Sequence, residues 1–230
     1  MRGHTPEIDL PIRPAATIIL VRGTGADAAV LMGQRGHAAA FLPSKFVFPG
    51  GAVEPDDADV ALHRPLPALC AARLATPDGP TPQALAAAAI RELCEETGLA
   101  LGGAQAWPGA VPVGWGEFAG RGLRPDAAGL RFVFRAITPP GRPRRFDARF
   151  FLADAAGVAG DIDDFSTASA ELSQLHWIAL DRVRTLDLPF ITEVVLAEVG
   201  ALLRQGPGGA GSGVPFFDNS GPVPTFRRLA

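Results

Sequence analysis

TPQALAAAAIRELCEETGL, residues 81–99, is the stretch of sequence that decides the fold. Thr81 is suited to cap the start of a helix, Pro82 suits the first helical position, and Gly98 suits the end. Alanine, the best helix former, dominates the interior. The apolar side chains that share one face of this helix are Ala86, Ile90, Leu93 and Thr97. The stretch therefore predicts a helix with an apolar face that packs on a core.

The C-terminal half of this helix carries three carboxylates on a different face. Glu92, Glu95 and Glu96 fall within an arc of about 100°. Like charges four residues apart cost an isolated helix about 0.2 to 0.5 kcal/mol. A solvated helix surface is the simplest explanation, and a bound hard cation such as Mg²⁺, which takes oxygen ligands, is the alternative. Arg91 lies four residues before Glu95 and can hold a carboxylate in a fixed orientation.

A second motif, FVFPGGAVEPDD at residues 46–57, lies upstream of the helix. Here an apolar strand ends in Gly50 and Gly51, which have no Cβ atom and let main-chain atoms approach a metal or a phosphate closely. The Gly50 carbonyl is a natural additional ligand for a cation. A turn that only ends the strand is the alternative reading of the same residues.

Composition excludes several classes of protein. The chain has 230 residues, of which 47% are hydrophobic, and a net charge of −3, so it has no overall electrostatic reason to bind nucleic acid or an anionic membrane. No apolar run approaches the roughly 18 to 20 residues that span a bilayer, and the opening lacks an apolar signal core. We expect a cytoplasmic protein. Cys70 and Cys94 have no metal-binding spacing and are expected to be small buried residues.

Strands are predicted in hairpins and helices in separate blocks. This pattern indicates an α+β fold with a mixed, largely antiparallel central sheet flanked by helices, and not a doubly wound parallel sheet. The expected strands are residues 13–23, 28–36, 46–48, 130–138, 144–153 and 171–180. Besides the central helix, we expect a short helix at 66–74 and a second long helix from 181 to about 204, broken at Pro189.

The domain organisation follows from these elements. Residues 1–13 are a short lead, and residues 14–204 are expected to form a single domain. Residues 205–230 comprise a glycine-rich linker, GPGGAGSG at 206–213, and a tail that can pack back through Phe216 and Phe217.

Together, the two motifs resemble the Nudix box. The second half matches at every specified position, namely Arg91, Glu92, Leu93, Glu95, Glu96, Gly98 and Leu99. In the first half Gly51 matches, while Asp57 stands where the family usually has glutamate. Residues 58–90 separate Asp57 from Arg91 where the family has a short spacer, and we assign 58–84 as an insertion within the box. Such an insertion resembles the coenzyme A diphosphatase-like Nudix subgroup. Three further stretches are similar to that subgroup: 30–51, 138–153 and 171–180.

The resemblance implies a Nudix-type α/β/α sandwich and a hydrolase that uses Mg²⁺ or Mn²⁺ to cleave a diphosphate bond. It implies that Glu95, Glu96 and the Gly50 carbonyl are metal ligands, that Glu92 is a ligand or the general base, and that Arg91 belongs to the catalytic machinery. Asp57 is left out of this assignment, because it is shorter than glutamate and displaced by the insertion. Some relatives recruit a base from outside the box, for which Glu117 and Glu171 are the candidates.

Substrate contacts are expected from arginine and phenylalanine. Arginine suits bidentate phosphate recognition, although a charge run is often a solvated loop and an aromatic residue beside a strand is usually core. The candidates are Arg35, Phe41, Phe48, Arg142, Arg144, Arg145 and Arg149. The implied substrate is coenzyme A or acyl-CoA. The alternatives are a diphosphatase for ADP-ribose or NADH, and a non-catalytic nucleotide-binding module. We expect the insertion at the mouth of the site and, by analogy, a possible homodimer.

Overall fold

The central helix forms as its sequence predicts. The structure is a computed structural model that describes residues 10–205, 213–221 and 223–230. Helix α2 (Pro82–Thr97) starts at Thr81, whose hydroxyl accepts a hydrogen bond from the Ala84 N–H at 3.1 Å. It ends at Gly98, which adopts a left-handed φ of 79° that glycine reaches without strain. The interior is almost entirely buried, so α2 is a core helix whose position fixes the residues that project from it.

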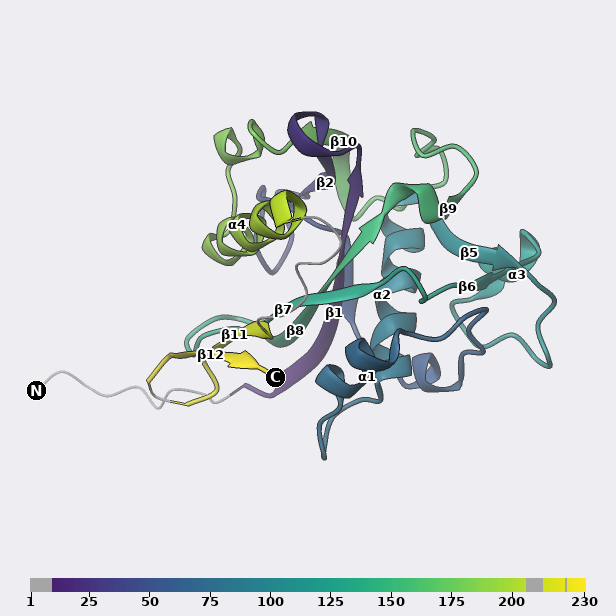
Figure 1. Ribbon diagram of the computed structural model, residues 1–230, viewed down its shortest axis with the longest axis horizontal. Helices are drawn as coiled ribbons and strands as arrows, with labels where there is room; N and C mark the ends of the chain where they lie inside the picture. Colours follow the sequence, from purple (N-terminus) through teal and green to yellow (C-terminus); the bar gives the residue numbers. More distant parts are fainter. Residues whose placement is uncertain (1–9, 206–212, 222) are drawn as a thin grey trace, which may run out of the picture.

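A mixed sheet of nine strands forms the centre of the molecule (Figure 1). Seven strands follow the order β10-β2-β1-β8-β7-β11-β12, and the short strands β3 and β4 pair with β2 and β1. The β1–β8 and β7–β11 pairs are parallel and the other pairs are antiparallel, which confirms the predicted fold class. The strands are β1 (Ile12–Arg22), β2 (Ala29–Arg35), β3 (Phe46–Val47), β4 (Gly50–Ala52), β7 (Arg131–Ile137), β8 (Arg145–Asp154), β10 (Leu172–Ala179), β11 (Val214–Asp218) and β12 (Thr225–Leu229).

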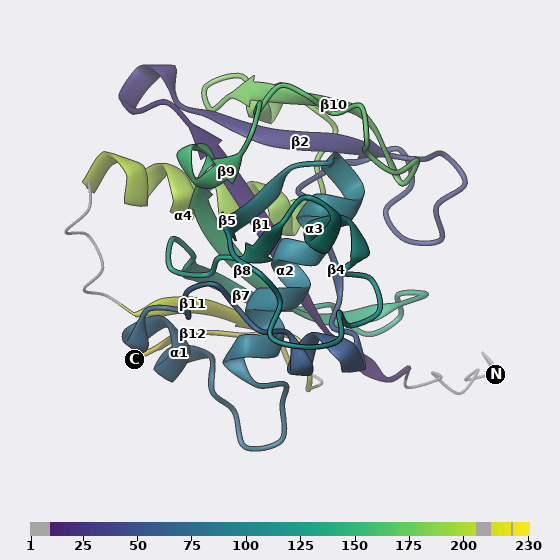
Figure 2. The ribbon, with the colours of Figure 1, turned by 90° about the vertical axis from the view of Figure 1, so that its right-hand side faces the viewer.

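Helices cover the two faces of this sheet. Along β1, Ile18 and Leu20 pack in the cluster beneath α2, whereas Ile19 and Val21 pack in the cluster beneath α4 (Phe190–Gln205). Successive side chains of a strand point to opposite faces, so both faces of β1 are core. Figure 1 and Figure 2 show α2 and α4 on opposite sides of the sheet, which is the expected α/β/α arrangement.

A smaller three-stranded sheet packs beside α2. Its order is β6-β5-β9, and the short helix α3 precedes β6. The elements are β5 (Ala100–Ala104), α3 (Gly116–Gly120), β6 (Leu123–Pro125) and β9 (Val158–Ala159). No helix in the described part of the chain has the length and apolar content needed to cross a bilayer.

Three expectations about boundaries need correction. Before Pro189 the chain forms only the single 3-10 turn η4 (Val183–Thr185), and the long helix begins at Phe190. The tail does not lie outside the domain, because β11 and β12 extend the main sheet beyond β7. The predicted insertion, 58–84, overlaps the first turn of α2 and contains the expected short helix as α1 (Ala68–Leu74). Residues 1–9 of the lead and 206–212 of the linker lie outside the described residues.

Candidate active site

The double glycine brings a strand edge against α2. Ile18 N–H donates to the Pro49 carbonyl and Val53 N–H to the Pro14 carbonyl, both at 3.0 Å. Along an antiparallel strand, every second residue hydrogen-bonds the neighbouring strand through its backbone N–H and carbonyl groups. Pro49 and Val53 bond to β1, so the backbone groups of Gly50 and Ala52 point away from β1. The Gly50 N–H donates to Glu96 Oε2 at 2.8 Å. The Gly50 carbonyl points the same way as its N–H, toward the carboxylates of α2.

Both glycines are required by close packing. A Cβ atom on Gly50 would lie 2.6 Å from the Ala16 carbonyl oxygen of β1. On Gly51 it would lie 2.4 to 2.5 Å from the three carboxylate atoms of Glu92. Real Cβ atoms do not approach so closely, so only glycine at position 51 leaves room for the Glu92 carboxylate where it lies.

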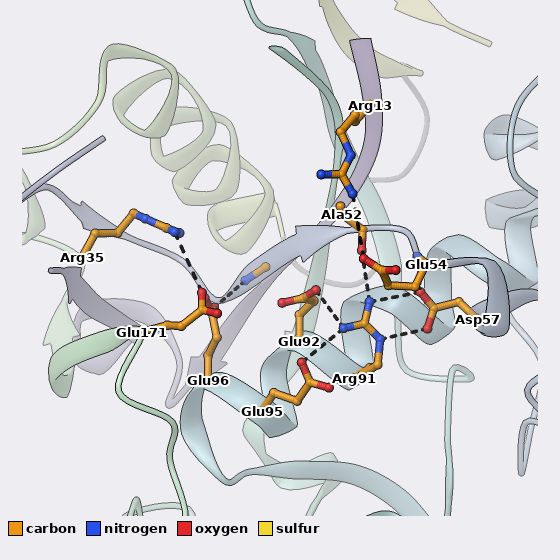
Figure 3. A network of polar contacts seen from close by, with 11 residues as sticks. Arg13, Arg35, Ala52, Glu54, Asp57, Arg91, Glu92, Glu95, Glu96 and Glu171 are labelled. Atoms are coloured by element: carbon orange, nitrogen blue, oxygen red, sulfur yellow. Dashed lines mark hydrogen bonds and ion pairs between the residues drawn. The ribbon is translucent and has the colours of Figure 1, made fainter. Parts of the chain in front are cut away.

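Arg91 is the centre of a buried ionic network (Figure 3). It donates from Nε and Nη2 to the two carboxylate oxygens of Asp57, at 3.0 and 3.1 Å, and from Nη2 to the Ala52 carbonyl at 3.0 Å. Its Nη1 donates to Glu92 at 2.8 Å and to Glu95 at 3.2 Å. A single guanidinium therefore joins the glycine strand to two carboxylates of α2, as expected for a group that orients them.

Asp57 is not displaced by the residues that follow it. It is 1% exposed and also accepts a hydrogen bond from the Glu54 N–H at 2.8 Å, which closes the 3-10 turn η2 (Pro55–Asp59). Asp57 lies beside Arg91 because residues 58–81 leave the site after Asp57 and return at the start of α2. The hydrogen bonds of Asp57 to Arg91 and to the Glu54 N–H keep the first half of the motif in place.

Burial makes the carboxylates costly to ionise. Burial raises the pKa of Glu96 to about 8, with Glu92 adding to the shift and the Gly50 N–H opposing it. Burial also raises the pKa of Glu92 to about 6, against the opposing charge of Arg91. A nearby cation would favour the charged forms of both groups.

The donor set fits a hard divalent cation, although it is not gathered around one point. Among the described residues no three acidic, histidine or cysteine side chains converge as a finished metal site, because Glu92 and Glu95 face Arg91 while Glu96 faces Gly50. The Glu95 side chain is 44% exposed, and Arg91 contacts it through one hydrogen bond of 3.2 Å. Three carboxylates beside an outward carbonyl are the oxygen ligands that Mg²⁺ or Mn²⁺ takes.

Arg35 and Glu171 lie beside the α2 carboxylates. Arg35 Nη2 is 3.9 Å from Glu171 Oε2, and Arg35 Nε is buried with no hydrogen-bond partner in the described chain. Glu171 contributes to the raised pKa of both Glu92 and Glu96, and Figure 3 shows it next to Glu96. The other candidate, Glu117 of α3, forms an ion pair with Arg121, the residue that follows this helix. Geometry therefore favours Glu171 over Glu117 as the carboxylate from outside the helix.

Several predicted substrate contacts have other positions. Phe48 is 4% exposed within the core beneath α4, and Phe41 stacks edge-on against Phe146 at 5.3 Å. Arg145 is 4% exposed and donates to the carbonyls of Thr138 and Asn219, so it holds the tail. This burial gives Phe48 and Arg145 structural roles. Arg142 and Arg144 are exposed in the turn between β7 and β8, and Arg149 is buried against Asp147.

One element near the site was missed by sequence reasoning. The turn Pro112–Trp115 is closed by the Trp115 N–H donating to the Pro112 carbonyl at 3.2 Å, and Trp115 is fully buried. At its third position Gly114 has a φ of 84°, and a Cβ there would lie 3.3 Å from Arg91 Cδ and 3.7 Å from Glu95 Oε1. The Pro-x-Gly pattern is a turn signal, but nothing in the sequence places it over Arg91.

The glycine-rich strand edge and the acidic helix α2 face each other in an α/β/α sandwich, and comparisons with known proteins identify the class to which this sandwich belongs. No family model matches the chain. A solved Nudix hydrolase from Alicyclobacillus acidocaldarius is 31% identical, with a TM-score of 0.63, over 85% of this chain and 94% of that one. Nudix hydrolase 7 of Caenorhabditis elegans is 27% identical over 186 residues, 72% of this chain, and this chain spans about half of that relative, 51%. The chain belongs to the Nudix hydrolase family.

Proposed function

We propose that the protein hydrolyses the diphosphate bond of a nucleoside-diphosphate-linked substrate with Mg²⁺ or Mn²⁺. The observation that carries this proposal is the meeting of two motifs: the Gly50 N–H contacts Glu96, and the Glu92 carboxylate packs directly on Gly51. A strand edge without Cβ atoms gives a diphosphate close access to those carboxylates.

In this proposal Glu92, Glu95, Glu96 and the Gly50 carbonyl hold the cation. When bound, the cation lowers the pKa of water and neutralises charge on the diphosphate. Arg91 keeps Glu92 and Glu95 in position through its hydrogen bonds at 2.8 and 3.2 Å. Water attacks one phosphorus, the bridging P–O bond breaks, and two phosphate monoesters leave.

The proton of the attacking water needs an acceptor. Glu171 is our candidate, because its side chain is 66% exposed and lies beside Glu96 and Arg35. Glu92, whose pKa is about 6, is the alternative base within the helix. Arg35 is the phosphate contact that we favour, since its buried Nε has no partner among the described residues.

Coenzyme A or acyl-CoA is the proposed substrate, giving phosphopantetheine or its acyl form and adenosine 3′,5′-bisphosphate. This choice rests on the resemblance of the long segment within the box and of the stretch that leads into it. Hydrolysis of ADP-ribose or NADH, and nucleotide binding without catalysis, are the competing outcomes. A cytoplasmic location and a homodimer stay predictions, the second testable by light scattering.

A substrate panel tests the proposal. The protein is incubated with Mg²⁺ and CoA, acetyl-CoA, ADP-ribose, NADH or diadenosine polyphosphates, and products are separated by chromatography. Turnover of ADP-ribose but not CoA would reject the CoA assignment, and nucleotide binding without turnover would reject catalysis. Glu96→Gln should remove most activity with the fold retained. Glu193→Gln, an exposed change at the start of α4, is the matched control.

A further inference from the structure

A cavity of about 360 Å³ lies on the sheet face that α2 covers, next to the loop that precedes α2. Strands β1, β7 and β8 form its floor, with Ile12 and Ile137 among the apolar residues, and the loop Thr76–Pro80 lines it from above. It lies across β1 from the candidate active site, since Ala16 pairs with Arg149 of β8 on one side and with Gly51 of β4 on the other. The cavity is therefore separate from the α2 carboxylates.

Arg149 is the buried charge in this cavity. It is 2% exposed, and its Nη1 donates to the Asp147 carbonyl and lies against Asp147 Oδ2, both at 2.9 Å. The Asp147 carboxylate is already occupied, because Arg135 donates to it from Nε at 2.9 Å and from Nη2 at 2.7 Å. Two guanidinium groups therefore share one carboxylate. Burial lowers the pKa of Arg149, and Asp147 offsets that shift only in part.

The opposite edge of the Arg149 guanidinium is free. Neither Nε nor Nη2 has a hydrogen-bond partner among the described residues, and Nη2 lies 3.8 Å from the position of a Cβ on Gly79 in the covering loop. The Nε–Nη2 edge is the fork that binds carboxylate and phosphate groups through two parallel hydrogen bonds. Neither nitrogen is among the fully enclosed polar atoms that lack a partner in the described chain, so both are open to the cavity and accessible to an anion there.

We propose that this cavity is a second ligand site, which binds a small molecule through a carboxylate or phosphate group held by the free edge of Arg149. The apolar part of the ligand packs on Ile12, Pro14 and Ile137, and its polar remainder faces solvent past Asp78. The site binds a single oxyanion group, because Asp147 neutralises the charge of Arg135 and one positive charge remains on Arg149. It is independent of the proposed hydrolysis and needs no metal.

Thermal unfolding of the full chain is measured in EDTA, which removes divalent cations and so suppresses cation-dependent binding at the proposed active site. Inorganic phosphate and benzoate are the two probes, each titrated against sodium chloride of equal ionic strength. A saturable rise in Tm with phosphate identifies a phosphate site, and a rise with benzoate identifies a carboxylate site with an apolar wall. The absence of a rise with either probe would overturn the proposal.

Variants locate the effect. Arg149→Met should weaken binding of the effective probe about ten- to a hundredfold, because charge-assisted hydrogen bonds are lost while the Arg135–Asp147 pair is kept. Arg144→Met, an exposed change near the start of β8, should bind normally. Thr76→Phe fills the cavity from the loop and leaves Arg149 intact, so it decides the question if Arg149→Met does not fold. Unchanged binding in Thr76→Phe would overturn the proposal.

Discussion

Arg91 binds Asp57 side-on, through two hydrogen bonds of 3.0 and 3.1 Å, across 34 positions of sequence. The two side chains are 7% and 1% exposed. The same guanidinium also holds Glu92 and Glu95. Asp57 therefore acts on the carboxylates of α2 through Arg91, as a positioning residue that needs no contact with the substrate.

Replacing this partner should affect both stability and catalysis. Asp57→Asn removes a buried charge opposite Arg91 and should lower the free energy of unfolding by about 2 to 4 kcal/mol, less than a fully broken pair because Glu92 and Glu95 remain. The turnover number should fall about ten- to a hundredfold. Urea unfolding and steady-state kinetics measure the two effects. Asp56→Asn, exposed in the same turn, is the control, and equal behaviour of both variants would contradict the positioning role.

A methyl group at position 51 should separate activity from stability. Gly51→Ala places its Cβ within 2.4 to 2.5 Å of the Glu92 carboxylate, which is the mobile end of a side chain and can move aside. The free energy of unfolding should change by less than about 1 kcal/mol, while the turnover number falls at least about tenfold. Gly36→Ala enters open space and serves as the control. Full activity in Gly51→Ala would show that the position of Glu92 is irrelevant.

The buried carboxylates predict that the free energy of unfolding of the metal-free protein falls as the pH rises. Because the pKa values of Glu92 and Glu96 are raised to about 6 and about 8, the folded state holds their protons more tightly than the unfolded state. Their contribution to stability is complete below the ordinary pKa of 4.5 and is lost as the pH rises through about 6 and about 8. Glu96→Gln should therefore match the wild-type protein near pH 5.

At pH 9, Glu96→Gln should be more stable than the wild-type protein by on the order of 2 kcal/mol, because the amide carries no buried charge. Thermal melts in EDTA at both pH values give the difference, and Glu193→Gln provides the baseline for an exposed glutamate. A stability difference that is the same at pH 5 and pH 9 would rule out this account.

The two glutamates outside the helix should differ in effect. Glu171→Gln should lower the turnover number by about a hundredfold, since removal of a general base typically costs that much or more. Glu117→Gln should stay within about twofold of the wild-type rate, because Glu117 is paired with Arg121 and is not among the charges that shift the pKa of Glu96. Single-turnover hydrolysis of the best panel substrate compares the two variants. A larger loss of activity in Glu117→Gln than in Glu171→Gln would identify Glu117 of α3 as the general base instead.

Sequence predicted those features that depend on neighbouring residues. The ends of α2 followed from Thr81 and Gly98, whose local chemistry decides them. The parallel pairing of Ile12 with Arg145 did not follow, because it depends on how distant strands assemble. The burial of Phe48 is likewise decided by the helix that covers its face. At the site, the sequence motif predicted that the glycine strand meets the acidic helix, as the Gly50–Glu96 hydrogen bond shows. The contact between Asp57 and Arg91 could not be predicted, because it depends on how residues 58–81 fold back to the start of α2.

The ion pair at the base of residues 58–81 has an evolutionary consequence. Asp57 and Arg91 hold the two ends of this excursion at a fixed separation, whatever lies between them. The entropy of closing a loop grows only with the logarithm of its length, so doubling the excursion costs about 0.6 kcal/mol. Mutation can thus change the exposed turns of this segment without moving the carboxylates, as long as its core residues Val60, Leu66 and Leu74 stay buried beside α2. New recognition surfaces can arise there while the chemistry is inherited unchanged.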